Sequence, residues 1–226
     1  MLKTLLMSFV LLLSVTTLAC NKAAASAIAI PDPAVDETPR NTSAKQTIVL
    51  AGGCFWGVDA VFKHVKGVTD VRSGYAGGKG DVSYEEVSTG STGYAESVQI
   101  TYDPSKITYG KLLKVFFAVA HDPTEINQQG PDTGTQYRSA IFYSTDEQQR
   151  IARAYIDQLN KAKVFRAPLA KQLAALDTFH EAEAYHQNYL ANHKDELYIV
   201  YNDLPKLENL RKDFPELYRE SALPQK

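Results

Sequence analysis

The sequence predicts one α/β or α+β domain, a two-layer sandwich in which helices flank a mixed β-sheet. Two patterns lead to this class. Short apolar or alternating runs, typical of strands, take turns along the chain with segments whose apolar residues recur every three or four positions, as in helices. No internal repeat and no second domain is apparent, so residues 47–226 are assigned to a single domain.

The first predicted strand and helix meet at a cysteine. Residues 48–51 are apolar and end at Gly52-Gly53, which predicts a buried strand that stops at a tight turn. From Cys54 to Gly67 the apolar residues recur at helical spacing. We therefore expect Cys54 in the first turn of a helix.

The remaining elements follow from alternation and capping signals. Val98, Ile100 and Tyr102 alternate with polar residues, as in a half-buried strand, and Thr108 can cap a helix that runs to Val119. A long polar loop, residues 121–138, suggests a binding role. The later segments are a strand at 140–143, a helix to Lys161 with a capping box at Thr145 and Gln148, a strand at 173–176, and helical segments at 183–193 and 204–218.

The N-terminus reads as an export signal. Residues 1–19 combine Lys3, an apolar run and small residues, as in a secretory signal peptide. Thr17-Leu18-Ala19-Cys20 resembles the lipobox of bacterial lipoproteins, which predicts lipidation of Cys20 and, with Asn21 after it, an outer-membrane anchor facing the periplasm. Cleavage within residues 23–27, giving a soluble periplasmic or secreted protein, is the alternative. Residues 20–46 are expected to form the lipidated cysteine and a flexible tether.

Composition narrows the class of partner. The 226-residue chain is 44% hydrophobic and 22% charged with a net charge of −2, so nothing suggests nucleic acid or an anionic membrane surface as a partner. Two cysteines, Cys20 and Cys54, make a disulfide framework untenable. The only two methionines lie within the signal, either by chance or because an oxidising environment disfavours them.

Cys54 has the surroundings of a reactive thiol. The unpaired N–H groups and dipole of a helix N-terminus favour an anion, which predicts a lowered thiol pKa. Gly53 and its neighbouring glycines leave room for a ligand, and Phe55 and Trp56 add apolar walls. Taken alone, a buried structural cysteine remains the plainer interpretation.

The motif 53–57, Gly-Cys-Phe-Trp-Gly, resembles the nucleophile motif of the A-type peptide methionine sulfoxide reductases (MsrA). Further blocks resemble that family in the same order between residues 47 and 205. They are the segments 74–78, 84–87, 92–98, 121–124, 132–139 and 184–187. The resemblance implies the MsrA-type, ferredoxin-like arrangement of the fold, with a helical C-terminal tail from about residue 188.

The resemblance also implies an activity and its residues. Such enzymes reduce the S epimer of methionine sulfoxide, free or in proteins, to methionine. Cys54 would attack the sulfoxide sulfur, and Glu96, with a pKa raised in an apolar pocket, would protonate the departing oxygen. The site is completed by Tyr84 and Tyr137, which would hold that oxygen, by Phe55 and Trp56, which would cradle the S-methyl group, by Gly53, which leaves room for the substrate, and by Asp132, which would organise hydrogen bonds.

Two departures from the family pattern matter. No cysteine follows residue 188, and Ser88 stands where some relatives carry one, so we expect a one-cysteine cycle without a bound cofactor. A thioredoxin-like protein or a small thiol would reduce the Cys54 sulfenic acid from outside. Tyr94 replaces a usual histidine near Glu96, which leaves the pKa of Glu96 and the substrate preference open.

Two other functions are kept as alternatives. A cysteine hydrolase or acyltransferase would use His180 or His186 as the base for Cys54. A silent lipoprotein scaffold would use the fold alone. No metal site is expected, because the histidine spacing at 180, 186 and 193 is not that of paired helical ligands. We expect a monomer that repairs oxidised proteins of the cell envelope under oxidative stress.

Overall fold

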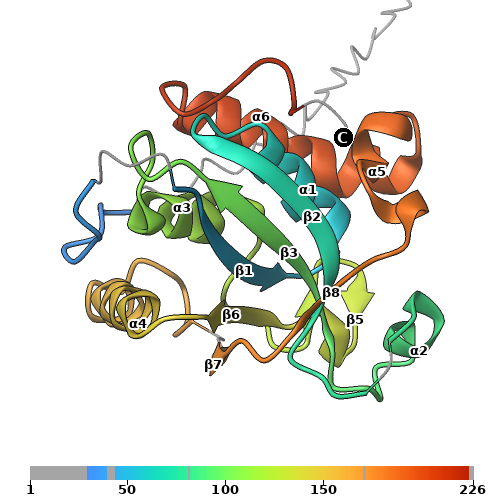
Figure 1. Ribbon diagram of the computed structural model, residues 1–226. Helices are drawn as coiled ribbons and strands as arrows, with labels where there is room; N and C mark the ends of the chain where they lie inside the picture. The colour runs from blue at the N-terminus through green and yellow to red at the C-terminus, as the bar shows by residue number, and fades with distance from the viewer. Residues whose placement is uncertain (1–29, 40–43, 81, 170–171, 224–226) are drawn as a thin grey trace, which may run out of the picture.

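A six-stranded mixed sheet forms the centre of the molecule in the computed structural model, which describes residues 30–39, 44–80, 82–169 and 172–223 (Figure 1). The strand order is β7-β6-β1-β3-β2-β8. All neighbouring pairs are antiparallel except β6 and β7. The strands are β1 (Gln46–Gly52), β2 (Val68–Ala76), β3 (Ala95–Tyr102), β6 (Ser139–Tyr143), β7 (Gln172–Ala175) and β8 (Phe179–Glu181).

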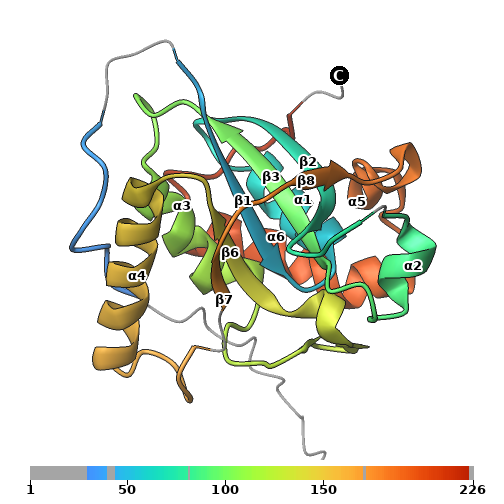
Figure 2. The same cartoon turned by 60° about the horizontal axis from the view of Figure 1, so that its bottom comes forward.

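The helices lie mainly on one face of this sheet, so the predicted mixed sheet with flanking helices is confirmed (Figure 2). The connection from β7 to β8 crosses the other face. The helices are α1 (Phe55–Lys63), α2 (Tyr84–Ser88), α3 (Tyr109–Val115) continued by the π-helical η1 (Phe116–Ala120), α4 (Asp146–Lys161), α5 (Tyr189–Asn192), and the π-helical η4 (Ile199–Asp203) continued by α6 (Leu204–Asp213). Short elements complete the chain: β4 (Gln128–Gln129), β5 (Asp132–Thr133), η2 (Thr135–Tyr137) and η3 (Ala184–His186).

The two faces of the sheet follow from the alternation of side chains along β1. Ile48 and Leu50 belong to the large core beneath the helices. Val49 and Ala51 belong to a smaller cluster on the other face, which Phe142 and Phe179 complete. Strand β1 is therefore apolar throughout because both of its faces are covered, and it ends inside the molecule.

The local signals for helices are mostly confirmed. The hydroxyl oxygens of Thr108 and Thr145 accept hydrogen bonds from the backbone N–H groups of Lys111 and Gln148, as predicted from the capping pattern. The predicted helix over 183–193 is wrong as a single element. It is broken at Asn188, which has a left-handed φ of 57°.

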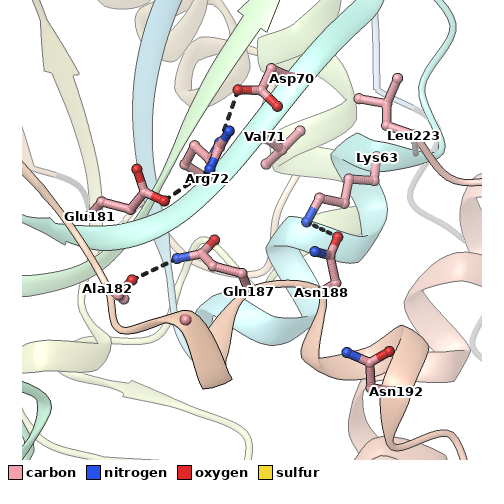
Figure 3. Close-up of a pocket in the computed structure, with 11 residues that line it drawn as sticks. Lys63, Asp70, Val71, Arg72, Glu181, Ala182, Gln187, Asn188, Asn192 and Leu223 are labelled. Atoms are coloured by element: carbon pink, nitrogen blue, oxygen red, sulfur yellow. Dashed lines mark hydrogen bonds and ion pairs between the residues drawn. The ribbon is translucent and has the colours of Figure 1, made fainter. Parts of the chain in front are cut away.

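That break adjoins a polar cavity of about 530 Å³ beside α1 (Figure 3). Its charged side chains already have partners. Arg72 bonds to Asp70 and Glu181, and Lys63 pairs with Asp59 and donates to the Asn188 side chain. We therefore treat the cavity as part of the scaffold that holds residues 186–189 in place.

Residues 30–39 lie against the domain, although the sequence assigns them to a flexible tether. Ile30 is buried in the core, and Asp32 pairs with Lys111 and Lys114. The side chains of Asp36 and Glu37 accept hydrogen bonds from the first N–H groups of α3. The tether prediction therefore needs correction for this segment, here called the strap (residues 30–37). The predicted signal peptide, Cys20 and residues 21–29 lie outside the described residues.

Candidate active site

The candidate site begins where β1 passes into α1. Gly53 has a φ of +85°, and a Cβ there would lie 2.5 Å from Cβ of Gln129, so the turn requires glycine. Cys54 follows as the N-cap residue of α1 and is only 7% exposed. Strand β1 is therefore followed by the thiol at a helix N-terminus, as predicted from the sequence.

The acidity of the thiol differs from the expectation. Burial raises the pKa of Cys54 well above its ordinary value, and the nearby carboxyls of Glu96 and Asp203 raise it further. The backbone N–H of Trp56 and the ammonium of Lys206 act in the opposite direction but weigh less. The predicted lowering of the thiol pKa is therefore wrong, because desolvation outweighs the helix N-terminus.

Glu96 on β3 lies beside the start of α1. Its Oε2 accepts a hydrogen bond of 3.0 Å from the backbone N–H of Phe55, and the residue is 2% exposed. Burial raises the pKa of Glu96 to about 8, with further contributions from Asp132 and Asp203. The carboxyl is consequently protonated at neutral pH, as expected from its surroundings, and can act as a proton donor.

Tyr84 and Tyr137 approach the same point from α2 and η2. Burial raises the pKa of both phenols, to about 12 for Tyr84, and the charges of Glu96 and Cys54 raise both further. Neither hydroxyl has a hydrogen-bond partner within the described residues, so both are free to bind a ligand. Asp132 on β5 accepts a hydrogen bond from the Tyr198 hydroxyl, which makes it an organising group.

Aromatic side chains form the wall of the site. Phe55 is fully buried between Tyr75 and His186. Trp56 donates from Nε1 to Nδ1 of His186 at 3.1 Å and stacks on Tyr189 with ring centroids 3.7 Å apart. These contacts hold the indole in a fixed plane beside the thiol.

The tail contributes residues that the sequence did not identify. Tyr189 stacks on Trp56, Tyr198 meets it edge-on, and Asp203 with Lys206 covers Gly57 at the first turn of α1. These positions carry no local motif. The one signal in the sequence was the segment 184–187, which resembles the family. That resemblance did not assign His186 a role in the reaction.

Tyr94 holds a loop together. Its hydroxyl donates to the carbonyl oxygen of Gly80 at 2.6 Å, and its ring meets His180 edge-on. A Cβ at Gly78 would overlap the Tyr94 ring, so that glycine makes room for it. The pKa of Glu96 is raised by burial and by neighbouring carboxyls, and Tyr94 is not among the causes.

The hydrolase alternative lacks its base. The His186 Nδ1 accepts the indole N–H, so its other ring nitrogen carries the proton in the neutral form. His180 interacts with the Tyr94 hydroxyl instead. Neither ring is therefore arranged to accept the thiol proton. Among the residues that the structure describes, no three His, Cys, Asp or Glu side chains gather closely enough to hold a metal ion.

Comparison with known proteins agrees with this geometry. The family model described as peptide methionine sulfoxide reductase matches residues 46–218. The Mesorhizobium japonicum protein named peptide methionine sulfoxide reductase MsrA 2 is 59% identical over 179 residues, covering 79% of this chain and 92% of its own. A Synechocystis protein of the same name is 48% identical over 190 residues, covering 83% and 89%.

Solved structures are similar as well. Reduced Mxr1 from Saccharomyces cerevisiae has a TM-score of 0.61 and 32% identity, covering 72% of this chain and 92% of its own. Methionine sulfoxide reductase A of Corynebacterium diphtheriae has a TM-score of 0.58 and 35% identity, covering 73% and 83%.

Proposed function

The chain belongs to the peptide methionine sulfoxide reductase family, as an oxidoreductase of the MsrA type, and on that premise we propose that Cys54 is its nucleophile and Glu96 its acid. The observation that carries the proposal is the pairing of a protonated carboxyl with a thiol at the start of α1, two groups that share Phe55 as a neighbour. The substrate is the S epimer of methionine sulfoxide, free or within a polypeptide.

The first step transfers the sulfoxide oxygen to Cys54. The Cys54 sulfur bonds to the sulfoxide sulfur while Glu96 donates its proton to the oxygen, and the thiol proton replaces the one that Glu96 gave up. The resulting hydroxyl then passes from the substrate sulfur to the Cys54 sulfur as the sulfur–sulfur bond breaks. The sulfoxide loses its S–O bond, Cys54 gains one, and the products are methionine and a Cys54 sulfenic acid. No other proton source is required. We assign the hydroxyls of Tyr84 and Tyr137 to hold the oxygen. Both hydroxyls lack a hydrogen-bond partner within the described residues, which supports this assignment.

Stereochemistry follows from the walls of the site. A sulfoxide sulfur carries a lone pair, an oxygen and two carbons. If the oxygen faces Glu96 and the S-methyl group lies against Phe55 and Trp56, the opposite epimer would place its oxygen on that aromatic wall. Leaving a polar oxygen against apolar rings without a hydrogen bond costs about 1–3 kcal/mol, so this wall supports selection of one epimer.

The second step returns Cys54 to the thiol. Two external thiols reduce the sulfenic acid, forming one disulfide and one water molecule. With no cysteine after residue 54 in the sequence, the chain itself holds no partner downstream of the nucleophile. We assign the reduction to a thioredoxin-like protein or a small thiol, with no bound cofactor and with the enzyme acting as a monomer.

The place of action is proposed from the N-terminal pattern. The signal at 1–19 and lipidation at Cys20 would put the enzyme on the periplasmic face of the outer membrane, where it would repair oxidised envelope proteins. Release as a soluble periplasmic or secreted protein is the alternative. Within the described residues, no helix has the length and apolar character that a membrane span requires.

The decisive experiment follows both epimers of N-acetyl-methionine sulfoxide with dithiothreitol as reductant. We expect loss of the S epimer alone, and complete loss of this turnover in Cys54→Ser. A mass spectrum of the oxidised enzyme should show one added oxygen on Cys54. Turnover by Cys54→Ser would overturn the assignment of the nucleophile, and an intramolecular disulfide during turnover would overturn the one-cysteine cycle.

A further inference from the structure

A buried ion pair from the C-terminal helices covers the start of α1. Asp203, the last residue of η4, is 0% exposed. Lys206, in the first turn of α6, places its Nζ 3.0 Å from Asp203 Oδ1, and its side chain is 17% exposed. Asp203 and Lys206 are three positions apart and therefore place opposite charges next to each other at the start of α1.

Both charged side chains lie against Gly57, which leaves the space that they occupy. A Cβ at residue 57 would overlap Asp203 Oδ1 and lie 2.7 Å from Lys206 Nζ. Cys54 is the N-cap residue of α1, and Gly57 lies in the first turn of the same helix. The ammonium therefore lies over the helix end that carries the nucleophile, in space that any side chain at position 57 would fill.

The pair is not built for stability alone. Oδ2 of Asp203 is buried and has no hydrogen-bond partner among the described residues. A buried charge whose bonds are not all made costs more than it returns. Such an arrangement calls for an explanation, and the pair covers the helix end that carries Cys54.

We propose that Lys206 is a positioning residue that stabilises negative charge developing on the Cys54 sulfur, and that Asp203 holds its ammonium in place. The inference deepens the proposed function and rests on Cys54 as nucleophile. In the attack the sulfur must gain anionic character as its proton leaves, and a nearby cation stabilises that form. In the second step one external thiol converts the sulfenic acid to a mixed disulfide with loss of water; when a second thiol attacks that disulfide, the Cys54 thiolate is the leaving group, and the same cation stabilises it.

Other groups act on the same sulfur and must be counted. Glu96 from β3 and Asp203 from η4 raise the thiol pKa, whereas Lys206 from α6 lowers it. Four phenols on α2, η2, α5 and the start of η4 also couple to the thiol: Tyr84, Tyr137, Tyr189 and Tyr198. Their raised pKa values keep them neutral across the working range. Asp132 raises the pKa of Glu96 and of Tyr198, and the ring of His186 lies against that of Tyr84.

The test is the pH dependence of Cys54 alkylation by iodoacetamide, quantified on the Cys54 peptide of the full chain. Asp203→Asn keeps an oxygen for Lys206 but removes the anion, so we expect the thiol pKa to fall by about one unit. Lys206→Met removes the cation, so we expect a thiol pKa above that of the wild type and a lower kcat/KM at neutral pH. Lys206→Arg should restore both values.

A matched control lies on the same helix. Glu208 and Arg211 form an exposed ion pair with the same three-residue spacing, 2.9 Å between Arg211 and the carboxylate. Glu208→Gln should leave the thiol pKa unchanged, because the exposed pair is screened by water. Identical thiol pKa values in wild type and Lys206→Met would overturn the proposal.

The outcome is separable from that of the proposed function. Alkylation reports on the sulfur of Cys54 whether or not this atom attacks the sulfoxide. If Cys54→Ser retained turnover, the proposed function would fail while the titration still measured the ion pair. If Lys206→Met failed to fold, Lys206→Gln, which removes the charge but keeps a polar partner for Asp203, would decide, since an unchanged thiol pKa in that variant contradicts the proposal.

Discussion

The first turns of α1 and α3 are built alike and used differently. In each, a buried glutamate from a distant segment accepts a hydrogen bond from the first backbone N–H of the helix: Glu96 from Phe55 and Glu37 from Tyr109. At the α3 turn Thr108 caps the helix, and Asp36 accepts hydrogen bonds from Gly110 and from the Thr108 hydroxyl. The α1 turn leaves several groups unpaired.

This difference between the two turns indicates where a ligand binds. At α1 the N-cap is Cys54, whose side chain makes no capping hydrogen bond, and Asp203 Oδ2 lacks a partner among the described residues. An unpaired buried polar group costs about 1–3 kcal/mol, so each such group calls for an explanation. The α3 turn is a structural clasp, whereas the α1 turn carries the residues that we propose act on the substrate.

The largest effect should come from Glu96→Gln. The amide keeps the shape but cannot donate the proton that the departing oxygen needs, so kcat/KM should fall about 10²–10⁴-fold. Turnover of the S epimer by purified wild type and variant measures this loss. A loss of less than about tenfold would mean that another group supplies the proton.

The same variant should gain stability as the pH rises. Because the pKa of Glu96 is raised to about 8, its favourable contribution is fully present at low pH and is lost as pH rises through that value. Melting temperatures of Glu96→Gln should therefore exceed those of the wild type increasingly between pH 5 and pH 8. For the same reason, wild-type kcat/KM should decline above about pH 8.

The opposite pattern, a loss of stability without a loss of activity, is expected at the first turn of α3. Glu37→Ala strands the Tyr109 N–H in the interior, so the free energy of unfolding should fall by about 1–3 kcal/mol while kcat/KM stays unchanged. Glu37→Gln, which retains an oxygen acceptor, is the matched control and should lose much less. Urea unfolding measures both, and a loss of activity in folded Glu37→Ala would break the distinction between the two turns.

The smallest effect should come from the exposed end of the strap. Asp32 pairs with Lys111 and Lys114, and these hydrogen bonds lower the pKa of Asp32 to about 2. Since Asp32 is 60% exposed, Lys111→Met should change the free energy of unfolding by no more than about 0.5 kcal/mol. A larger change in urea unfolding would show that this ion pair contributes more to strap docking than an exposed pair should.

Local signals in the sequence were sufficient for most of the fold. The N-caps at Thr108 and Thr145 and the alternation along β3 depend on neighbours in the chain, and all three predictions are confirmed. Strand β2 was missed because Thr69, Asp70 and Arg72 give it no clean alternation, and its pairing with β3 and β8 decides its conformation. The strap was missed for a similar reason, since its contacts are with α3 and α4.

The site residues likewise divide into those that sequence motifs identify and those whose place depends on tertiary packing. Cys54, Glu96, Tyr84 and Tyr137 lie in motifs, and the structure brings them together. The acidity of the thiol was misjudged because the helix N-terminus is visible in the sequence, whereas the burial that outweighs it arises from tertiary packing. Asp203 and Lys206 could not be identified, because their importance depends entirely on docking above Gly57.

The single tryptophan of the chain has a practical consequence. Trp56 is fixed between Tyr189 and His186, next to the thiol, so all indole emission of the protein originates within the site. Binding of a sulfoxide, oxidation of Cys54 or docking of a reductant would alter the surroundings of that one fluorophore. The enzyme therefore carries its own optical reporter, and each step of its cycle can be timed by stopped-flow fluorescence without a label.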